Sequence, residues 1–334
     1  ASKDVHEDVR SIAVQELAKN FKDDPDTKSW LKERTIQYDN YVRYVVVQEL
    51  AENFKDDPDT KSWLKERATQ DDNNYVRCAA VIGLAENFKD DPDTKSILKE
   101  CTTQDDDNDV RYMAVRQLAE NFKDDPDTKS ILKERATQDD HYDMRRAAVQ
   151  ELANNFKDDP DTKSILKERA IQDDNWNVRR AAVQELAKNF KDEPDTKSIL
   201  KECATQDDNW NVRRAAVQEL AKNFKDNSDI KFILKERATQ DDNWNVRRAA
   251  VQELAKYFKY QPELFHIYHN CAVDDSFECE EEDETNPRRI ALEIIVKQFP
   301  QHPQTLPLLR DRAENDPDEK VREYAQKKLK QWEG

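Results

Sequence analysis

The sequence predicts an all-α protein, a right-handed α-solenoid of stacked helix pairs. One segment repeats at a fixed interval, the apolar residues of every copy fall at helical spacing, and glycine is almost absent. The stretch 207–224 recurs nearly unchanged 34 residues earlier and 34 residues later. An arginine, usually preceded by valine, marks the phase at positions 10, 43, 77, 111, 145, 179, 213, 247, 288 and 322. This period is typical of a solenoid, whose units cannot bury their apolar faces alone.

The composition excludes several classes of protein. Charged residues make up 38% of the chain and the mean hydropathy is −1.09, values that without the periodicity would indicate disorder. Only two glycines occur, Gly83 and Gly334, so neither a Walker A loop nor a dinucleotide fingerprint can be built. The net charge of −17 argues against non-specific binding of nucleic acid or of an anionic membrane.

The cysteines and the lack of targeting signals indicate the compartment. Five scattered cysteines, an odd number, are typical of a reduced, cytosolic protein. No apolar run approaches the roughly 20 residues of a membrane span, and no signal peptide is recognisable. We therefore expect a soluble cytoplasmic protein that does not bind membranes.

Each unit is predicted to contain a short helix and a long helix. The short helix opens with Asp-Asp-Pro-Asp, as at 158–161, which supplies an aspartate cap and a proline at the first helical position. The long helix, as at 177–190, carries a broad apolar arc. The interpretation is one solenoid over 1–334, made of a half-unit N-terminal cap (1–24), regular repeats (25–258), an atypical Cys/His repeat (259–302) with an acidic loop (274–285), and a C-terminal capping repeat (303–334).

The two ends of the array and its second copy depart from the pattern. The first copy lacks a short helix, so the chain is either a segment of a longer array or one that starts with a half-unit cap. In the second copy Tyr38 stands where the other copies have aspartate, and we expect a local irregularity there.

The phase-marking arginine lies within the apolar arc of the long helix, where an unpaired charge is costly. An aspartate recurs six residues before this arginine. The two residues predict a structural ladder of Asp–Arg bonds along the turns, formed either from one unit to the next or within each unit. Such pairs set register more than they add stability. The best-preserved pairs are Asp173/Arg179, Asp207/Arg213 and Asp241/Arg247.

These residues carry a family resemblance. The pattern Asp-x-x-x-x-Val-Arg-x-x-Ala with leucine four residues further on, as at Asp173, Val178, Arg179, Ala182 and Leu186, resembles the HEAT-repeat family, and its bacterial phycobilisome-lyase-type branch in particular. The chain also resembles the HEAT arms of bacterial NACHT-type NTPases, which would make it part of a larger protein. The resemblance implies the fold, and HEAT arrays serve many functions.

A polar stripe on the long helices is the predicted binding surface, because solenoids bind along their concave layer. The alanines of the long helices have small side chains that permit close approach, so we expect the long helices to form the concave layer. The stripe falls one, five and nine residues after each phase-marking arginine, and changes from aromatic and acidic to basic along the chain. The alternative is a solvated stripe copied by duplication, with glutamates such as Glu185 cancelling the arginines. The candidate residues are Tyr44, Tyr112, Arg116, Arg146, Arg180, Gln184, Lys188, Arg214, Gln218, Lys222, Arg248, Gln252 and Lys256.

Aromatic residues recur in the turn before the long helix. Trp176, Trp210 and Trp244 occupy one position of the repeat, and Tyr142 is assigned one residue later in phase. A row of tryptophans could stack on a ligand, or it could cover the joint between neighbouring units.

The remaining chemistry is sparse. His266, His269, Cys271 and Cys279 are ligand types that zinc accepts, but Cys271 shares its position in the repeat with Cys101 and Cys203, so we assign no metal. The acidic loop lacks the spacing of a calcium loop. No nucleophile, base and oxyanion donor can be assembled, so we expect neither catalysis nor a cofactor.

The function that fits these observations is a non-catalytic scaffold or sensor arm that binds a protein, or a covalently linked domain, along its concave face. One alternative is nucleic-acid binding by the basic stripe, although the net charge argues against it. The other is a bilin-lyase-type subunit, which the resemblance implies.

Overall fold

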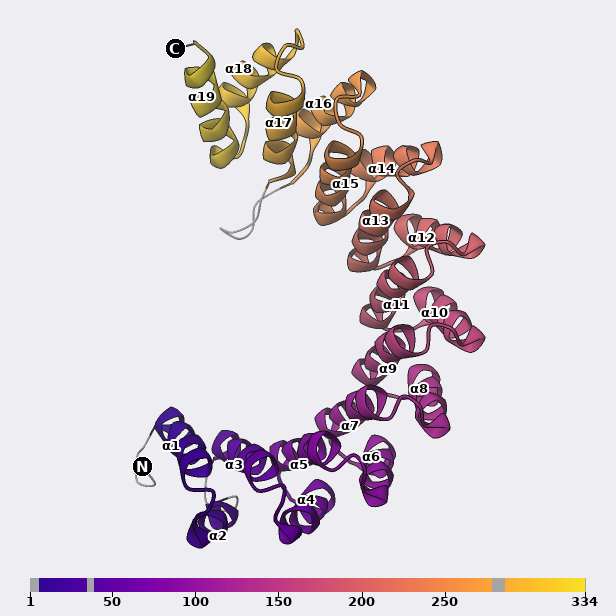
Figure 1. Ribbon diagram of the computed structural model, residues 1–334. Helices are drawn as coiled ribbons and strands as arrows, with labels where there is room; N and C mark the ends of the chain where they lie inside the picture. Colours follow the sequence, from indigo (N-terminus) through magenta and orange to yellow (C-terminus); the bar gives the residue numbers. More distant parts are fainter. Residues whose placement is uncertain (1–5, 35–38, 278–285, 334) are drawn as a thin grey trace. The chain divides into compact units, whose positions relative to one another are not determined.

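The computed structural model describes residues 6–34, 39–277 and 286–333. These residues form nineteen α-helices and one 3₁₀ helix, with no strand among them, so the prediction of an all-α solenoid of helix pairs is confirmed (Figure 1). The chain divides into two compact units, Ala1–Ile165 and Leu166–Gly334, which are described separately.

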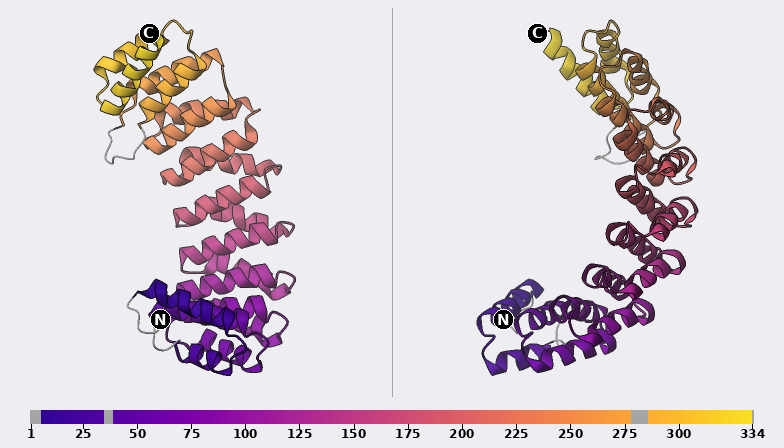
Figure 2. Two further views of the ribbon diagram at one scale, coloured as in Figure 1. Left: turned by 60° about the vertical axis from the view of Figure 1, so that its left-hand side comes forward. Right: turned by 45° about the vertical axis from the view of Figure 1, so that its right-hand side comes forward.

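The first unit contains two layers of helices. The long, odd-numbered helices form one layer and the short, even-numbered helices form the other (Figures 1 and 2). The long helices are α1 (Glu7–Asn20), α3 (Asn40–Asn53), α5 (Asn74–Asn87), α7 (Asn108–Asn121) and α9 (Tyr142–Asn155). The short helices are α2 (Pro25–Arg34), α4 (Pro58–Gln70), α6 (Pro92–Gln104) and α8 (Pro126–Gln138).

The second unit follows the same plan after α10 (Pro160–Gln172), which spans the boundary. Its long layer contains α11 (Trp176–Asn189), α13 (Trp210–Phe224), α15 (Trp244–Tyr257), α17 (Pro287–Gln298) and α19 (Glu319–Glu333). Its short layer contains α12 (Pro194–Gln206), α14 (Ser228–Gln240), the 3₁₀ helix η1 (Pro262–Leu264), α16 (Phe265–Asp274) and α18 (Thr305–Asn315).

The predicted signals place the helix ends. The carboxylate of Asp125 caps α8 by accepting the amide hydrogen of Asp127, with Pro126 at the first helical position. The apolar arc of α11 is fully buried at Val178, Ala182 and Leu186. Two expected features, the irregularity at Tyr38 and most of the acidic loop, lie outside the described residues.

Within each unit, most of the phase-marking arginines link one repeat to the next. The Nε and Nη2 atoms of Arg179 donate to both carboxylate oxygens of Asp207, each over 2.8 Å. Its Nη1 donates to the main-chain oxygen of Asp173 over 2.9 Å. The hydrogen bonds to Asp207 outweigh burial and raise the pKa of Arg179. The same two-pronged arrangement joins Arg77 to Asp105, Arg213 to Asp241, and Arg247 to Asp275.

This geometry corrects the pairing expected from the sequence. The aspartate six residues before each arginine, such as Asp173 before Arg179, contributes its main-chain carbonyl to that arginine. The carboxylate partner is the aspartate 28 residues later, in the following repeat. Two rungs differ: Arg10 binds Asp39, one position beyond Tyr38, and Arg111 binds the side chain of Asn108.

A second series of ion pairs joins the short helices. Lys133 binds Asp159 over 3.0 Å and Asp161 over 2.7 Å, both at the start of the next short helix, and Lys129 also binds Asp159. The equivalent Lys65 and Lys99 bind the corresponding aspartates. The hydrogen bond from Lys129 is the main cause that lowers the pKa of Asp159 to about 2.

Replacing Asp241 by asparagine tests the arginine ladder. Asp241→Asn removes the buried carboxylate that pairs with the guanidinium of Arg213, so the free energy of unfolding is expected to fall by about 3 kcal/mol. Asp242 binds the same guanidinium but is 86% exposed. Asp242→Asn is therefore the matched control, expected to cost less than about 1 kcal/mol. Denaturant titrations followed by circular dichroism measure both, and equal losses would contradict the assigned role of Asp241.

The lysine series predicts a pH dependence. Because the folded pKa of Asp159 is depressed to about 2, its contribution is present above its unfolded pKa of about 4 and is lost as the pH falls through about 2. The double variant Lys129→Met, Lys133→Met is expected to unfold at a lower temperature than the parent at pH 6. That difference should close progressively between pH 4 and pH 2. A difference that stays constant over this range would rule out the ionised carboxylate as its source.

Gly83 allows α5 to approach α3 closely. A Cβ atom at this position would lie 2.6 Å from the Cβ of Ala51, which belongs to the neighbouring helix and cannot rotate away. Gly83→Ala is therefore expected to destabilise the protein by about 1–3 kcal/mol through overpacking, despite alanine's better helix propensity. The double variant with Ala51→Gly should recover most of the loss. Thermal unfolding of the four proteins of this cycle measures the coupling, and independent effects would refute the proposed contact.

Candidate functional site

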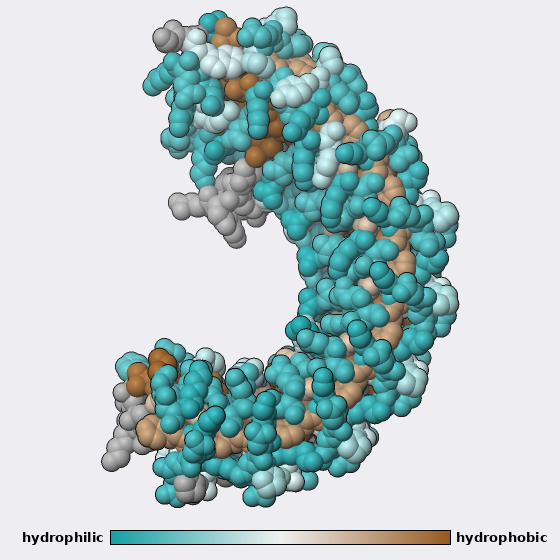
Figure 3. All heavy atoms as spheres, viewed as in Figure 1, coloured by the Kyte–Doolittle hydropathy of each residue, from teal (hydrophilic) through white to brown (hydrophobic). Residues whose placement is uncertain are grey.

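The stripe on the long helices of the second unit is accessible to solvent. Gln184, Gln218 and Gln252 are exposed, as are Lys188, Lys222 and Lys256, while Arg180, Arg214 and Arg248 are half-buried. The helices that carry them, α11, α13 and α15, lie side by side in one layer (Figures 1 and 2). Apolar residues show mainly as a band between the layers, and the surface around it is predominantly hydrophilic (Figure 3). The nine residues thus form a continuous polar surface, which we call the basic stripe.

The stripe residues of the first unit are less uniform. Tyr44 is half-buried and accepts a hydrogen bond from Gln48 over 2.9 Å, and burial raises the pKa of its hydroxyl. Tyr112 is also half-buried, with the guanidinium of Arg116 6.0 Å from the centre of its ring. Arg146 forms an ion pair with Asp143 over 2.8 Å. The positive charge of this part of the stripe is therefore partly neutralised by its own helices.

The glutamates of the long helices do not cancel the arginines of the basic stripe. Glu185 lies 3.4 Å from Lys188, and Glu219 lies 3.5 Å from Lys222. These pairs lie two turns beyond the arginines on the same helices. Among the described residues no carboxylate is within ion-pair distance of Arg180 or Arg214. The glutamates therefore neutralise the lysines of the stripe, as the alternative prediction stated, but they do not neutralise Arg180 or Arg214.

The tryptophans of the second unit lie beneath the arginines of the basic stripe. The guanidinium carbon is 5.4 Å from the ring centre for Arg180 over Trp176, and 5.1 Å for Arg214 over Trp210. The same distance is 4.8 Å for Arg248 over Trp244. The sequence pattern predicts the arginines and the tryptophans as two separate sets. The signal that could have joined them is their constant separation of four residues, which places them on the same helix face.

The tryptophans are themselves partly buried. All three are half-buried, and the ring of Trp244 packs against Phe277 with centres 4.9 Å apart. Tyr142 was assigned to the wrong phase. It is the first residue of α9, as Trp176 is of α11, so it occupies the same position of the repeat as the tryptophans.

The Cys/His repeat contains no metal-binding arrangement among its described residues. The ring centres of His266 and His269 lie 6.0 Å and 5.9 Å from that of Phe265, whose ring also stacks on His302. Burial lowers the pKa of His269. The thiol of Cys271 is buried, donates to the main-chain oxygen of Ala238, and has its pKa raised to about 12. Cys279 lies outside the described residues.

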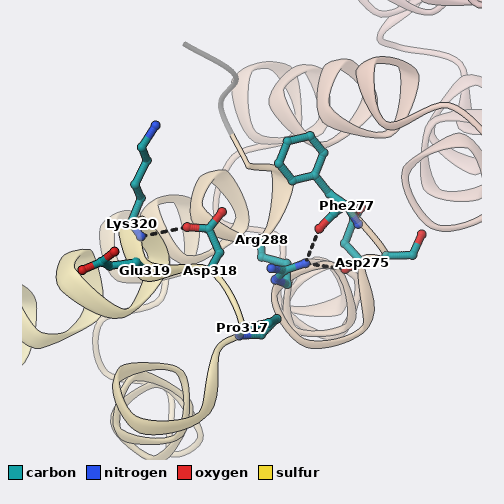
Figure 4. A pocket seen from close by; sticks show the side chains of 8 residues that line it. Asp275, Phe277, Arg288, Pro317, Asp318, Glu319 and Lys320 are labelled. Atoms are coloured by element: carbon teal, nitrogen blue, oxygen red, sulfur yellow. Dashed lines mark hydrogen bonds between the residues drawn. The ribbon is translucent and has the colours of Figure 1, made fainter. Parts of the chain in front are cut away.

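A cavity with a volume of about 620 Å³ lies beside the last repeats of the second unit. Arg288 donates there to the main-chain oxygens of Asp275 and Phe277, and Asp318 accepts the amide hydrogen of Lys320 (Figure 4). The cavity adjoins the chain that enters residues 278–285, which are not described, so we assign it no ligand. No helix within the described ranges is long and apolar enough to cross a membrane.

Comparisons with solved structures support the fold. The YibA protein of Escherichia coli is 20% identical, with 88% of this chain and 97% of that chain covered and a TM-score of 0.52. Yeast importin-β (Kap95p) is 15% identical, with 97% of this chain and 47% of that chain covered and a TM-score of 0.62. The chain thus spans about half the length of the importin. The complex of CpcE and CpcF of phycocyanin lyase from Nostoc is matched with a TM-score of only 0.37, too low to bear on function.

The family is shown by the sequence itself. No individual curated protein is matched. A family model described as HEAT repeats matches residues 1–85, 62–153, 132–221, 163–255 and 198–282, which together cover most of the chain. With the helix pairs and the inter-repeat arginines described above, these matches identify the chain as a member of the HEAT-repeat family.

Proposed function

We propose that this protein is a non-catalytic binding scaffold that holds a protein partner along the exposed face of its long helices. The observation that carries the proposal is the basic stripe, in which Arg180 and Arg214 are solvent-accessible and no described carboxylate pairs with them. Elsewhere the chain pairs its arginines closely, as Arg179 with Asp207. An unpaired guanidinium held in place on a regular surface is a suitable anchor for a partner, because arginine and tryptophan are frequent interface anchors.

The rest of the molecule supports a scaffold. The described cysteines, 78, 101, 203 and 271, are all buried, and burial raises the pKa of each thiol to about 12, so none is an activated nucleophile. The internal bonds between repeats hold neighbouring long helices in register, which keeps the stripe residues at regular intervals. The partner is a separate protein or a domain of a larger protein that contains this array.

Site-specific photo-crosslinking tests this function. A photo-reactive residue at Gln218, in the basic stripe, should crosslink the partner in cells that produce the protein. The same residue at Gln206, exposed at the end of the short helix α12, should not. Replacing Arg180, Arg214 and Arg248 by glutamine should reduce the product at position 218 by about tenfold, because three charged contacts of roughly 0.5 kcal/mol each are lost.

A charge-matched control separates specific contacts from net charge. The arginine substitutions change the net charge by −3, as does replacing Gln172, Gln206 and Gln240 by glutamate at the exposed ends of the short helices. The control variant is expected to crosslink through position 218 as the parent does. Equal products from positions 218 and 206, or equal losses in both variants, would refute binding at the stripe.

A further inference from the structure

The first turns of α11, α13 and α15 present the same side-chain unit three times. Each begins with tryptophan, and the arginine four residues later lies over its ring. We call these six residues, Trp176, Arg180, Trp210, Arg214, Trp244 and Arg248, the Arg/Trp row. Stacking on an indole restricts the guanidinium while leaving its N–H groups, which lie in the plane of the group, available to an anion.

The row concentrates positive charge. In α9 the equivalent Arg146 is neutralised by Asp143, three residues before it. In α11, α13 and α15 that position holds asparagine: Asn177, Asn211 and Asn245. The amide oxygen of Asn245 accepts a hydrogen bond from Arg248 over 3.1 Å, so the position is within reach of the guanidinium. Burial, together with the like charges of Arg180 and Arg248, lowers the pKa of Arg214, as expected where cations lie close together.

The interval between the three arginines restricts which anion fits. Neighbouring packed helices lie roughly 8–10 Å apart. A polyproline II helix rises about 3.1 Å per residue with three residues per turn, so every third side chain lies on one face at intervals of about 9 Å. A β-strand instead brings every second side chain to one face, at intervals of about 7 Å. The polyproline II repeat therefore matches the general spacing of packed helices more closely than the strand repeat does.

We propose that the Arg/Trp row binds an extended acidic peptide in the polyproline II conformation, with Asp or Glu at every third position and proline between. Each carboxylate would bind one guanidinium, and the exposed parts of the tryptophans would contact the proline rings, as aromatic residues do in other polyproline-binding grooves. This inference rests on the proposed function, since it specifies the segment of the partner that the basic stripe recognises.

The row suits a peptide better than a single-stranded nucleic acid. Sequence-tolerant binding of single strands relies on aromatic rings with open faces on which bases stack. Here each tryptophan is half-buried and has a guanidinium over its ring. The net charge of −17 also disfavours a long polyanion, which would extend beyond the row onto acidic surface.

Binding of synthetic peptides to the full chain tests the proposal. The probe is a fluorescent peptide of four Glu-Pro-Pro triplets. A second peptide of the same composition carries its four glutamates in one block, and a third replaces proline by glycine. Fluorescence anisotropy at fixed salt is expected to show the triplet peptide binding about tenfold more tightly than either, because only it presents carboxylates at the repeat interval on a preorganised chain. Equal affinities for the triplet and block peptides would overturn the proposal.

The sequence of α9 supplies the model for a variant in which the arginines of the row are neutralised. Asn177→Asp, Asn211→Asp and Asn245→Asp together copy the Asp143–Arg146 pair of α9 into the row, an arrangement the fold already accommodates. This variant should keep the parent's unfolding temperature and bind the triplet peptide about tenfold more weakly, because its arginines are neutralised. The control with Gln172, Gln206 and Gln240 replaced by glutamate should bind as the parent does. Unchanged affinity in the aspartate variant would place the peptide elsewhere and refute the proposal.

Three further outcomes have distinct meanings. If a single-stranded oligonucleotide of equal charge binds the row more tightly than the triplet peptide, and the aspartate variant loses it, the peptide assignment is wrong. If position 218 crosslinks a protein partner but no triplet peptide binds, this inference fails while the proposed function stands. If neither crosslinking nor peptide binding occurs at the stripe, both fail.

Discussion

The buried bond between arginine and aspartate of successive repeats is the constraint on which the rest of the structure depends. Arg213 and Asp241 are both almost fully buried, and the guanidinium uses two of its sides, one for the carboxylate of the next repeat and one for a main-chain oxygen of its own. Burying a charge costs free energy unless the charge is paired and hydrogen-bonded. The bond between Arg213 and Asp241 therefore restricts the relative position of the two helices that carry it. Each rung thereby sets the register between one long helix and the next.

Fixed register has a consequence for the surface. Because Arg179, Arg213 and Arg247 join their repeats to the next in the same way, side chains at equal positions on α11, α13 and α15 occur at equal intervals. On these helices the arginine that follows each ladder arginine therefore belongs to a regular, solvent-accessible series. Arg179 is buried and paired with Asp207, whereas Arg180 lies at the surface over Trp176. Two neighbouring residues of one chemical type thus have opposite roles, one inside the array and one facing a partner.

Small departures from the repeat separate the two parts of the stripe. The change from Asp143 to Asn177 removes an acid beside the first-turn arginine, and the change from Tyr142 to Trp176 enlarges the ring at the same point. The backbone plan is the same in both helices, so these substitutions alter the charge of the surface and leave the fold unchanged. A repeat architecture can vary exposed positions such as these because other contacts, in the core and between repeats, hold the helices together.

The sequence by itself determined the helix pairs, their phase and the family resemblance, because the period, the caps and the apolar arcs are local signals. It also singled out Arg179 as a buried charge that needs a partner. Only the tertiary structure decided which partner that is, since the distance between Arg179 and Asp207 depends on how one repeat packs on the next. The stacking of Arg180 on Trp176, the lysine bonds between short helices and the close approach of Gly83 to Ala51 were likewise settled by packing. These are contacts between side chains, and a linear pattern fixes which residues share a helix face but not how far apart their atoms lie.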